Sequence, residues 1–164
     1  MYSIDLVRYI IKNYPNPEEL SKARINKIMY LIDWKSAIEN EKQITNIKWI
    51  FNHYGPYVGE IEEIINIDYR LKIEKGRNIF GNEKNIIRLI EDKNFNSPTE
   101  EEKVIIDFVI EKTRKFYWNK FINLVYSTYP IISQEKGSQL NLLELAKEYK
   151  KIKQNDGAES WVMS

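Results

Sequence analysis

The spacing of the apolar residues changes along this sequence, and that change limits the fold more than any other feature. Apolar positions recur with a helical period over residues 3–40 and again over residues 97–153. Between them, residues 43–53 are rich in β-branched and aromatic side chains, and residues 68–91 alternate between apolar and polar. Because 164 residues suit one domain, the pattern predicts a mostly helical α+β fold: a single compact helical domain with a small antiparallel β-sheet or hairpin in the middle of the chain.

Local signals place the individual helices. We expect them over residues 3–13, 17–40, 56–65, 97–116, 119–126 and 140–153, with a kink in the second near Ser21. Ser97 is the expected N-cap of the fourth helix, Pro98 its first residue, and Glu100 the residue that closes a capping box. On the second helix the expected core stripe consists of Leu20, Ala23, Ile28, Leu31, Ile32 and Ile38. We assign residues 1–153 to the domain and residues 154–164 to a flexible C-terminal tail.

Composition excludes several kinds of site. The chain has no cysteine and one histidine, His53, so thiol chemistry and a histidine-cluster metal site are excluded, and we expect no cofactor or metal. Neither a phosphate-binding glycine loop nor a known nucleophile motif is present. The 25 basic residues nearly balance the 24 acidic ones, which argues against direct nucleic-acid binding. Without a long apolar run or a targeting segment, we expect a cytoplasmic protein that does not bind membranes.

A dense aromatic cluster surrounds a sharp turn near residue 55. Gly55 permits a backbone angle closed to other residues and Pro56 fixes the next one, so the chain must turn there. The aromatic and imidazole side chains around this turn are Trp49, Phe51, His53, Tyr54 and Tyr57. Exposed aromatic residues on a rigid turn are good binding anchors, whereas buried ones are an ordinary core, and the sequence leaves both interpretations open.

A second cluster lies on the helix expected over residues 17–40. Tyr30 and Trp34 are one helical turn apart, and Asp33 lies beside them at the margin of the expected core. Asp33 is either part of a surface that faces a partner or a buried carboxylate that holds the following loop. His53 has two similar interpretations: a proton-transfer residue in a cleft, or a structural residue at a strand end.

Residues 26–62 resemble the Panacea domain, the SocA-like antitoxin family that also includes phage-associated GepA-like proteins. The helix signature of that family is matched by Lys27, Tyr30, Leu31, Asp33 and Trp34. The link that follows is matched by Ile44-Thr45, and the turn by Tyr54-Gly55-Pro56. Many members carry a Thr-His pair after the second long helix, where this chain has Thr128-Tyr129.

The resemblance implies an antitoxin-type protein-binding domain and no enzyme. Such a domain neutralises a cognate toxin, expected from an adjacent gene, by direct contact, and one relative delivers its toxin to a protease as an adaptor. The expected partner-binding residues are Tyr30, Asp33, Trp34, Trp49, His53, Tyr54, Gly55, Pro56 and Tyr57. Two alternatives stay open: a prophage or mobile-element regulator that binds host machinery, and a small hydrolase or transferase that uses His53 with Asp33 or a nearby tyrosine.

Overall fold

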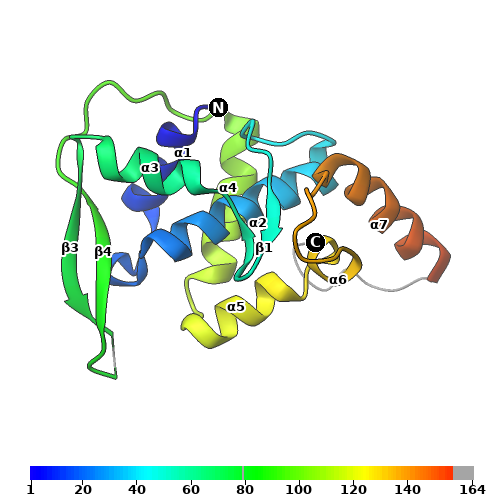
Figure 1. Cartoon of the computed structure of the whole chain (residues 1–164). Coiled ribbons are helices and arrows are strands. Elements are labelled where there is room, and N and C mark those ends of the chain that lie inside the picture. Colours follow the sequence, from blue (N-terminus) through cyan, green and yellow to red (C-terminus); the bar gives the residue numbers. More distant parts are fainter. Residues whose placement is uncertain (79, 157–164) are drawn as a thin grey trace.

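The computed structural model describes residues 1–78 and 80–156 (Figure 1). In chain order its elements are α1 Ser3–Asn13, the 3-10 helix η1 Pro17–Glu19, α2 Lys22–Asn40, β1 Ile50–Asn52, β2 Gly55–Tyr57, α3 Gly59–Ile67, β3 Leu71–Arg77, β4 Glu83–Leu89, α4 Glu100–Thr113, α5 Trp118–Tyr126, α6 Tyr129–Ser133 and α7 Leu142–Asp156. The strands form two antiparallel two-stranded sheets, β1 with β2 and β3 with β4. The predicted class, a mostly helical domain with a small antiparallel β component, is confirmed.

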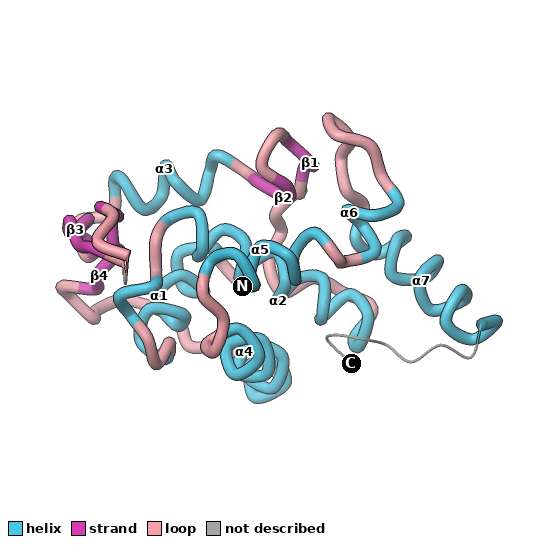
Figure 2. Tube along the Cα trace, turned by 90° about the horizontal axis from the view of Figure 1, so that it is seen from below, coloured by secondary structure: helices cyan, strands magenta, loops and turns pink. Residues whose placement is uncertain are grey.

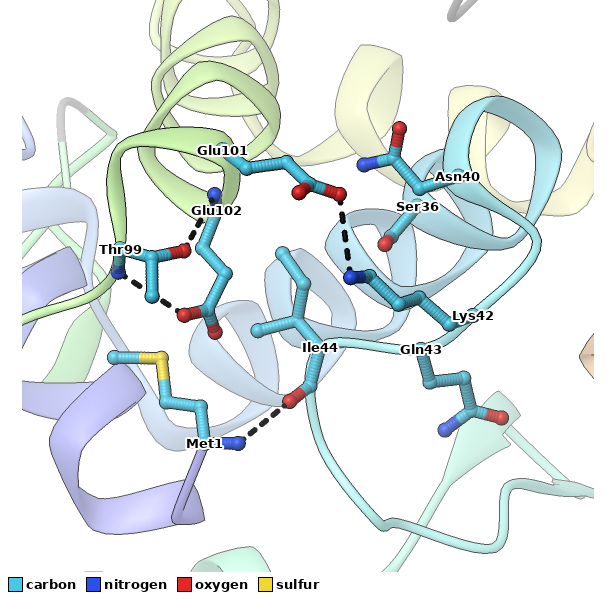
Figure 3. Close-up of a pocket in the computed structure, with 9 residues that line it drawn as sticks. All are labelled: Met1, Ser36, Asn40, Lys42, Gln43, Ile44, Thr99, Glu101 and Glu102. Carbon is cyan, nitrogen blue, oxygen red and sulfur yellow. Dashed lines mark hydrogen bonds and ion pairs between the residues drawn. The ribbon is translucent and has the colours of Figure 1, made fainter.

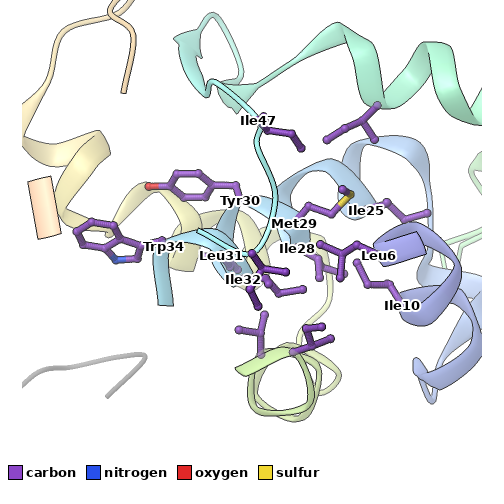
Figure 4. Packing of buried hydrophobic residues seen from close by; sticks show 14 of the residues in the cluster. Leu6, Ile10, Ile25, Ile28, Met29, Tyr30, Leu31, Ile32, Trp34 and Ile47 are labelled. Carbon is purple, nitrogen blue, oxygen red and sulfur yellow. The ribbon is translucent and has the colours of Figure 1, made fainter. Parts of the chain in front are cut away.

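Helix α2 is the centre of the fold. Every side chain from Arg24 to Ala37 is buried, because α1, α3, α4, α7 and both small sheets surround the helix. Figure 4 shows Leu6 and Ile10 of α1 beside Ile25 and Ile28 of α2. A helix that is covered on every side has no single apolar stripe, and polar groups on it must then find partners inside the protein.

The expected core stripe on this helix was therefore too narrow, and at one position it was wrong. Ala23 is exposed and Ile38 is only half-buried. A kink was predicted near Ser21, and at that place the chain leaves the helical conformation, so the predicted helix over residues 17–40 is divided into η1 and α2. The Ser21 side chain caps α2 by accepting a hydrogen bond from the Arg24 backbone nitrogen at 3.1 Å.

The strand expected over residues 43–53 is much shorter than predicted. Only Ile50–Asn52 forms a strand, and it pairs with Gly55–Tyr57, so Phe51 lies opposite Pro56. Residues 41–49 are irregular because their backbone groups bond to a side chain of α2, as described below. The next helix begins at Gly59 instead of residue 56, since the preceding residues are used in β2.

The second sheet is a single long hairpin that packs at one end of the molecule. Leu71 lies opposite Leu89, and Arg77 opposite Glu83. The Ile87 nitrogen donates to the Leu20 carbonyl at 2.9 Å and so attaches the hairpin to the start of α2. Figure 2 shows this hairpin and α7 at opposite ends of the tube. Hairpin formation in this region was predicted, and it is confirmed.

The N-terminus of α4 differs from the prediction by two residues. The cap is Thr99 and not Ser97, and Glu102 replaces Glu100 in the capping box. The Glu102 nitrogen donates to Thr99 Oγ1 at 3.2 Å, and the Thr99 nitrogen donates to Glu102 Oε1 at 3.0 Å. Both residue pairs have the same spacing, so the sequence pattern alone could not choose between them.

The C-terminal region follows the prediction with two differences. The short helix α6 was not expected, and α7 continues to Asp156, so the first residues of the predicted tail are helical. Residues 157–164 of that predicted tail lie outside the described residues. Within the described ranges, no helix has both the length and the apolar character needed to cross a bilayer.

Candidate functional site

Asp33 holds the loop that follows α2 through five hydrogen bonds. Its Oδ1 accepts from the backbone nitrogens of Ile44 and Thr45, each at 3.0 Å. Its Oδ2 accepts from the Thr45 hydroxyl, from Trp49 Nε1 at 2.9 Å and from Gln43 Nε2 at 3.2 Å. Burial raises the pKa of Asp33 to about 6, and the hydrogen bonds from Thr45, Trp49 and Ile44 oppose that shift. Of the two interpretations of Asp33, the buried carboxylate that holds the following loop is confirmed.

Tyr30 and Trp34 are also structural. The Tyr30 hydroxyl lies 2.8 Å from Thr128 Oγ1, and its ring meets the Trp49 ring edge to face at 5.6 Å between centroids. Trp34 meets the Tyr149 ring of α7 in the same manner at 5.7 Å. Tyr30, Asp33, Trp34 and Trp49 are at most 1% exposed. In this conformation they have no surface to offer a partner, which corrects the expected placement of Tyr30, Asp33 and Trp34 at the margin of the core.

The β1–β2 turn packs against α5. Gly55 has φ of +93°, and a Cβ added there would lie 3.4 Å from Cζ of Tyr126. Asn52 Oδ1 accepts a hydrogen bond from the Tyr54 nitrogen at 3.0 Å and closes the turn. On its other side, β1 is paired by the chain after α6, where the Phe51 nitrogen donates to the Ser138 carbonyl at 2.9 Å. Figure 1 shows this turn reaching toward α5.

The predicted residues of this turn divide between surface and interior. His53 is exposed, Tyr54 is 74% exposed and Tyr57 is half-buried, whereas Gly55 and Pro56 are buried. The His53 ring meets the Tyr54 ring edge to face at 5.8 Å. The hydrolase or transferase alternative paired His53 with Asp33 or a nearby tyrosine, and the pairing with Asp33 is ruled out in this conformation. Both carboxylate oxygens of Asp33 are bonded to the buried loop, and His53 lies at the surface.

An open cleft of about 560 Å³ lies between this turn, α2, α3 and α5. We call it the aromatic cleft, and its lining residues are Ala23, Lys27, Asn52, Tyr54, Tyr57, Glu62, Trp118, Ile122 and Tyr126. The three residues from α5 are spaced four apart, so they share one face of that helix. Two predicted partner-binding residues, Tyr54 and Tyr57, therefore lie on a common hollow with residues that the sequence analysis did not select.

Lys27 is the unusual member of the cleft. Its side chain belongs to the buried stretch of α2, and the residue is 3% exposed. Burial lowers the pKa of Lys27 to about 8, and the negative charge of Glu62 opposes the shift. Across the part of the chain that the structure describes, neither a hydrogen bond nor an ion pair reaches the Lys27 ammonium. The cleft thus combines aromatic walls with a cation that has no bonded partner.

Glu62 is the acidic group of the cleft. Burial is the largest cause that raises the pKa of Tyr57, and Glu62 raises it further through its charge and by accepting a hydrogen bond from the phenol. Glu62 is therefore hydrogen-bonded to Tyr57, whereas it acts on Lys27 only through its charge.

Two other hollows are less suited to binding a charged partner. One, of about 380 Å³, lies between the end of α2 and the start of α4, and Figure 3 shows how its groups pair with one another. Lys42 Nζ lies 3.3 Å from Glu101 Oε1, and the Met1 amine donates to the Ile44 carbonyl at 2.9 Å. The other hollow, of about 520 Å³, is mostly apolar and includes Tyr2 and Tyr69.

The sequence contained a signal for the missed residues of the cleft. That signal is the match of Lys27 to the helix signature quoted above. The stripe on α5 has the same spacing as a core stripe, so nothing in the sequence marks Trp118 as 40% exposed.

Fold and site together define a small, mostly helical α+β domain. Its central helix carries both a loop-holding aspartate and the lysine of an open aromatic cleft. Residues 25–130 match the family model described as antitoxin SocA-like, Panacea domain, and the chain belongs to this family. The matched range contains every lining residue of the cleft except Ala23. Comparisons with curated proteins and with solved structures found no match.

Proposed function

We propose that this protein is an antitoxin that neutralises a cognate toxin in the cytoplasm by direct contact, and that it is no enzyme. The aromatic cleft and the β1–β2 turn form the contact surface in this proposal. Membership of an antitoxin-like family supports the role. The single observation that supports the location is that Tyr54, 74% exposed on a rigid turn, borders a cleft with further aromatic walls.

The physical argument concerns how a small surface gains affinity. Aromatic side chains on a rigid backbone bury much area at little entropic cost, and they dominate the energetics of many interfaces. Tyr54 of the β1–β2 turn and Trp118 of α5 both line the cleft and are both exposed. A toxin side chain that entered the cleft would contact these rings, and those contacts would form the centre of the interface.

The test is coexpression with the open reading frame next to the gene. The wild-type chain should restore growth when that frame is toxic and should co-purify with its product. Tyr54→Ala should weaken binding at least about tenfold, the loss expected of an interface hot spot. Tyr69→Ala is the matched control, because Tyr69 is 68% exposed on the other apolar hollow. Failure of the wild-type chain to rescue growth or bind would contradict the proposal. If only Tyr69→Ala weakened toxin binding, the contact surface would be the hollow that includes Tyr69 and not the aromatic cleft.

The same experiment distinguishes two modes of neutralisation: occupation of the toxin surface and delivery of the toxin to a protease. If the toxin keeps its steady-state level while growth recovers, occupation of its surface is sufficient. A shortened toxin half-life that depends on the antitoxin would instead support delivery to a protease. A gene that stands alone in a prophage would favour the alternative of a regulator that binds host machinery.

A further inference from the structure

The charged residues in the buried stretch of α2 differ in whether their charged groups have bonded partners. Arg24 is bonded to the Tyr14 hydroxyl and to the carbonyls of Thr113 and Phe116, and its guanidinium lies 4.4 Å from the Phe121 ring centroid. Lys35 Nζ pairs with Glu39 at 2.8 Å and lies 4.2 Å from the Phe108 ring centroid.

Asp33 accepts five hydrogen bonds, so Lys27 is the one charged residue of this stretch that lacks a bonded partner among the described residues. A buried ammonium without an anion is costly, so folding alone does not explain a lysine at this position. The Lys27 side chain lines the aromatic cleft, so a group that entered the cleft could reach it.

The chemistry of such a group follows from the surroundings. Lys27 is itself 3% exposed, and a partly desolvated ammonium attracts a carboxylate more strongly than one in bulk water does. The walls are tyrosine and tryptophan rings, which suit the carbon chain that carries the acid. The volume of about 560 Å³ lies well inside the range of roughly 300–1,000 Å³ typical of ligand sites, so a neighbouring apolar side chain fits as well.

We propose that the aromatic cleft receives an acidic side chain of the toxin, whose carboxylate pairs with the Lys27 ammonium. This inference rests on the proposed function and names the chemistry of the toxin residue at its centre. Charge complementarity selects this occupant, because the interior of the cleft presents a cation without a bonded partner. Glu62 lines the same cleft and its charge acts on Lys27, so it is the acidic group with which the incoming carboxylate competes.

The first arm of the test needs no toxin. The full chain is titrated with phenylacetate, with the uncharged phenylacetamide and with the cationic phenethylamine, and NMR follows the Lys27 side chain and the Trp118 indole. Phenylacetate should bind at least about tenfold more tightly than phenylacetamide, a difference of about 1.4 kcal/mol. Lys27→Met should abolish that preference. Lys120→Met, which removes an exposed lysine of α5 outside the cleft, should leave it unchanged.

The second arm uses the product of the adjacent gene. Lys27→Met should weaken its binding at least about tenfold, whereas Lys120→Met should not. Among Asp→Asn and Glu→Gln variants of the toxin, one should lose binding to the wild-type chain and lose nothing further with Lys27→Met. Because the methionine variant removes a buried charge and keeps the length of the side chain, it should fold, and its melting temperature verifies this.

The outcomes distinguish this inference from the proposed function. If the toxin binds wild type and Lys27→Met equally, the inference is overturned and the antitoxin role stands. If phenylacetate shows no preference over phenylacetamide, or the Lys120→Met control loses the preference too, the inference is also overturned. If the adjacent gene product does not bind the wild-type chain, the proposed function fails, and the inference that depends on it fails with it.

Discussion

Trp49 Nε1 donates a hydrogen bond to Asp33 Oδ2 at 2.9 Å, and this bond joins the central helix to the residue just before β1. The loop between them has little regular pairing of its own, and the Asp33 carboxylate bonds to it at several points. The same side chain binds the backbone of Ile44 and Thr45, which is the position of the Ile-Thr link in the sequence pattern. Two separate pieces of that pattern, the helix signature and the Ile-Thr link, therefore meet at Asp33.

Replacing the carboxylate should destabilise the protein strongly. Asp33→Asn places an amide NH₂ group among donors, and the loss expected from breaking a buried charged network is about 3 kcal/mol. Urea denaturation measures the free energy of unfolding. Asp107→Asn is the control, because Asp107 is exposed and accepts a single bond from Tyr9, so its loss should stay below about 1 kcal/mol. Equal effects of the two substitutions would contradict the role given to Asp33.

The direction of the Tyr30–Thr128 hydrogen bond can be assigned and tested. Thr128 Oγ1 donates its only proton to the Val125 carbonyl at 2.7 Å, so the Tyr30 hydroxyl is the donor to Thr128 Oγ1. Tyr30→Phe and Thr128→Val should each destabilise the fold, with a coupling energy of about 1 kcal/mol in a double-mutant cycle. Additive losses would show that the two hydroxyl groups do not depend on each other.

Gly55→Ala should distort the cleft, because alanine is strained at a φ of +93° and its Cβ would lie 3.4 Å from the Tyr126 ring. The expected cost is about 1–2 kcal/mol in thermal or urea unfolding. Gly59→Ala is a matched control, since Gly59 has no atom within 4 Å of the added Cβ and begins α3. That control should be neutral or slightly stabilising. If the Gly55→Ala variant were stable and bound the toxin with unchanged affinity, the turn would not be part of the contact surface.

Periodicity predicted the fold class and most helix positions, because these depend on patterns within one segment. It failed where a contact between distant segments decides the conformation. The loop over residues 41–49 has strand-like composition, yet Asp33 takes the backbone bonds that a second strand would have supplied. The burial of α2 on every face is likewise invisible in its own sequence, because it depends on which elements surround it.

The candidate site was partly predictable for the same reason. Tyr54 and Tyr57 were selected from a turn whose residues are adjacent in the sequence, and both line the cleft. Trp118 and Tyr126 come from a helix more than sixty residues later, so no local pattern connects them with the turn. Residue type also fails to separate structural aromatics from exposed ones, since Trp49 and Trp118 differ only in what packs around them.

The lysine of the cleft should make stability depend on pH in a particular direction. Burial lowers the pKa of Lys27 from 10.5 to about 8, so between these values the unfolded chain binds more protons than the folded one. The stability of wild type relative to Lys27→Met should therefore rise as the pH rises from about 8 to about 10.5, and should be flat below that range. At about 1.4 kcal/mol for each pKa unit, the upper limit is about 3 kcal/mol, and contact with solvent in the open cleft reduces it.

Urea unfolding of both proteins across this range measures the difference in their stability, and the effects of other titrating groups cancel in that difference. The exposed-lysine control, Lys120→Met, should show no such slope, and parallel curves for wild type and Lys27→Met would show that the Lys27 ammonium is not desolvated by folding.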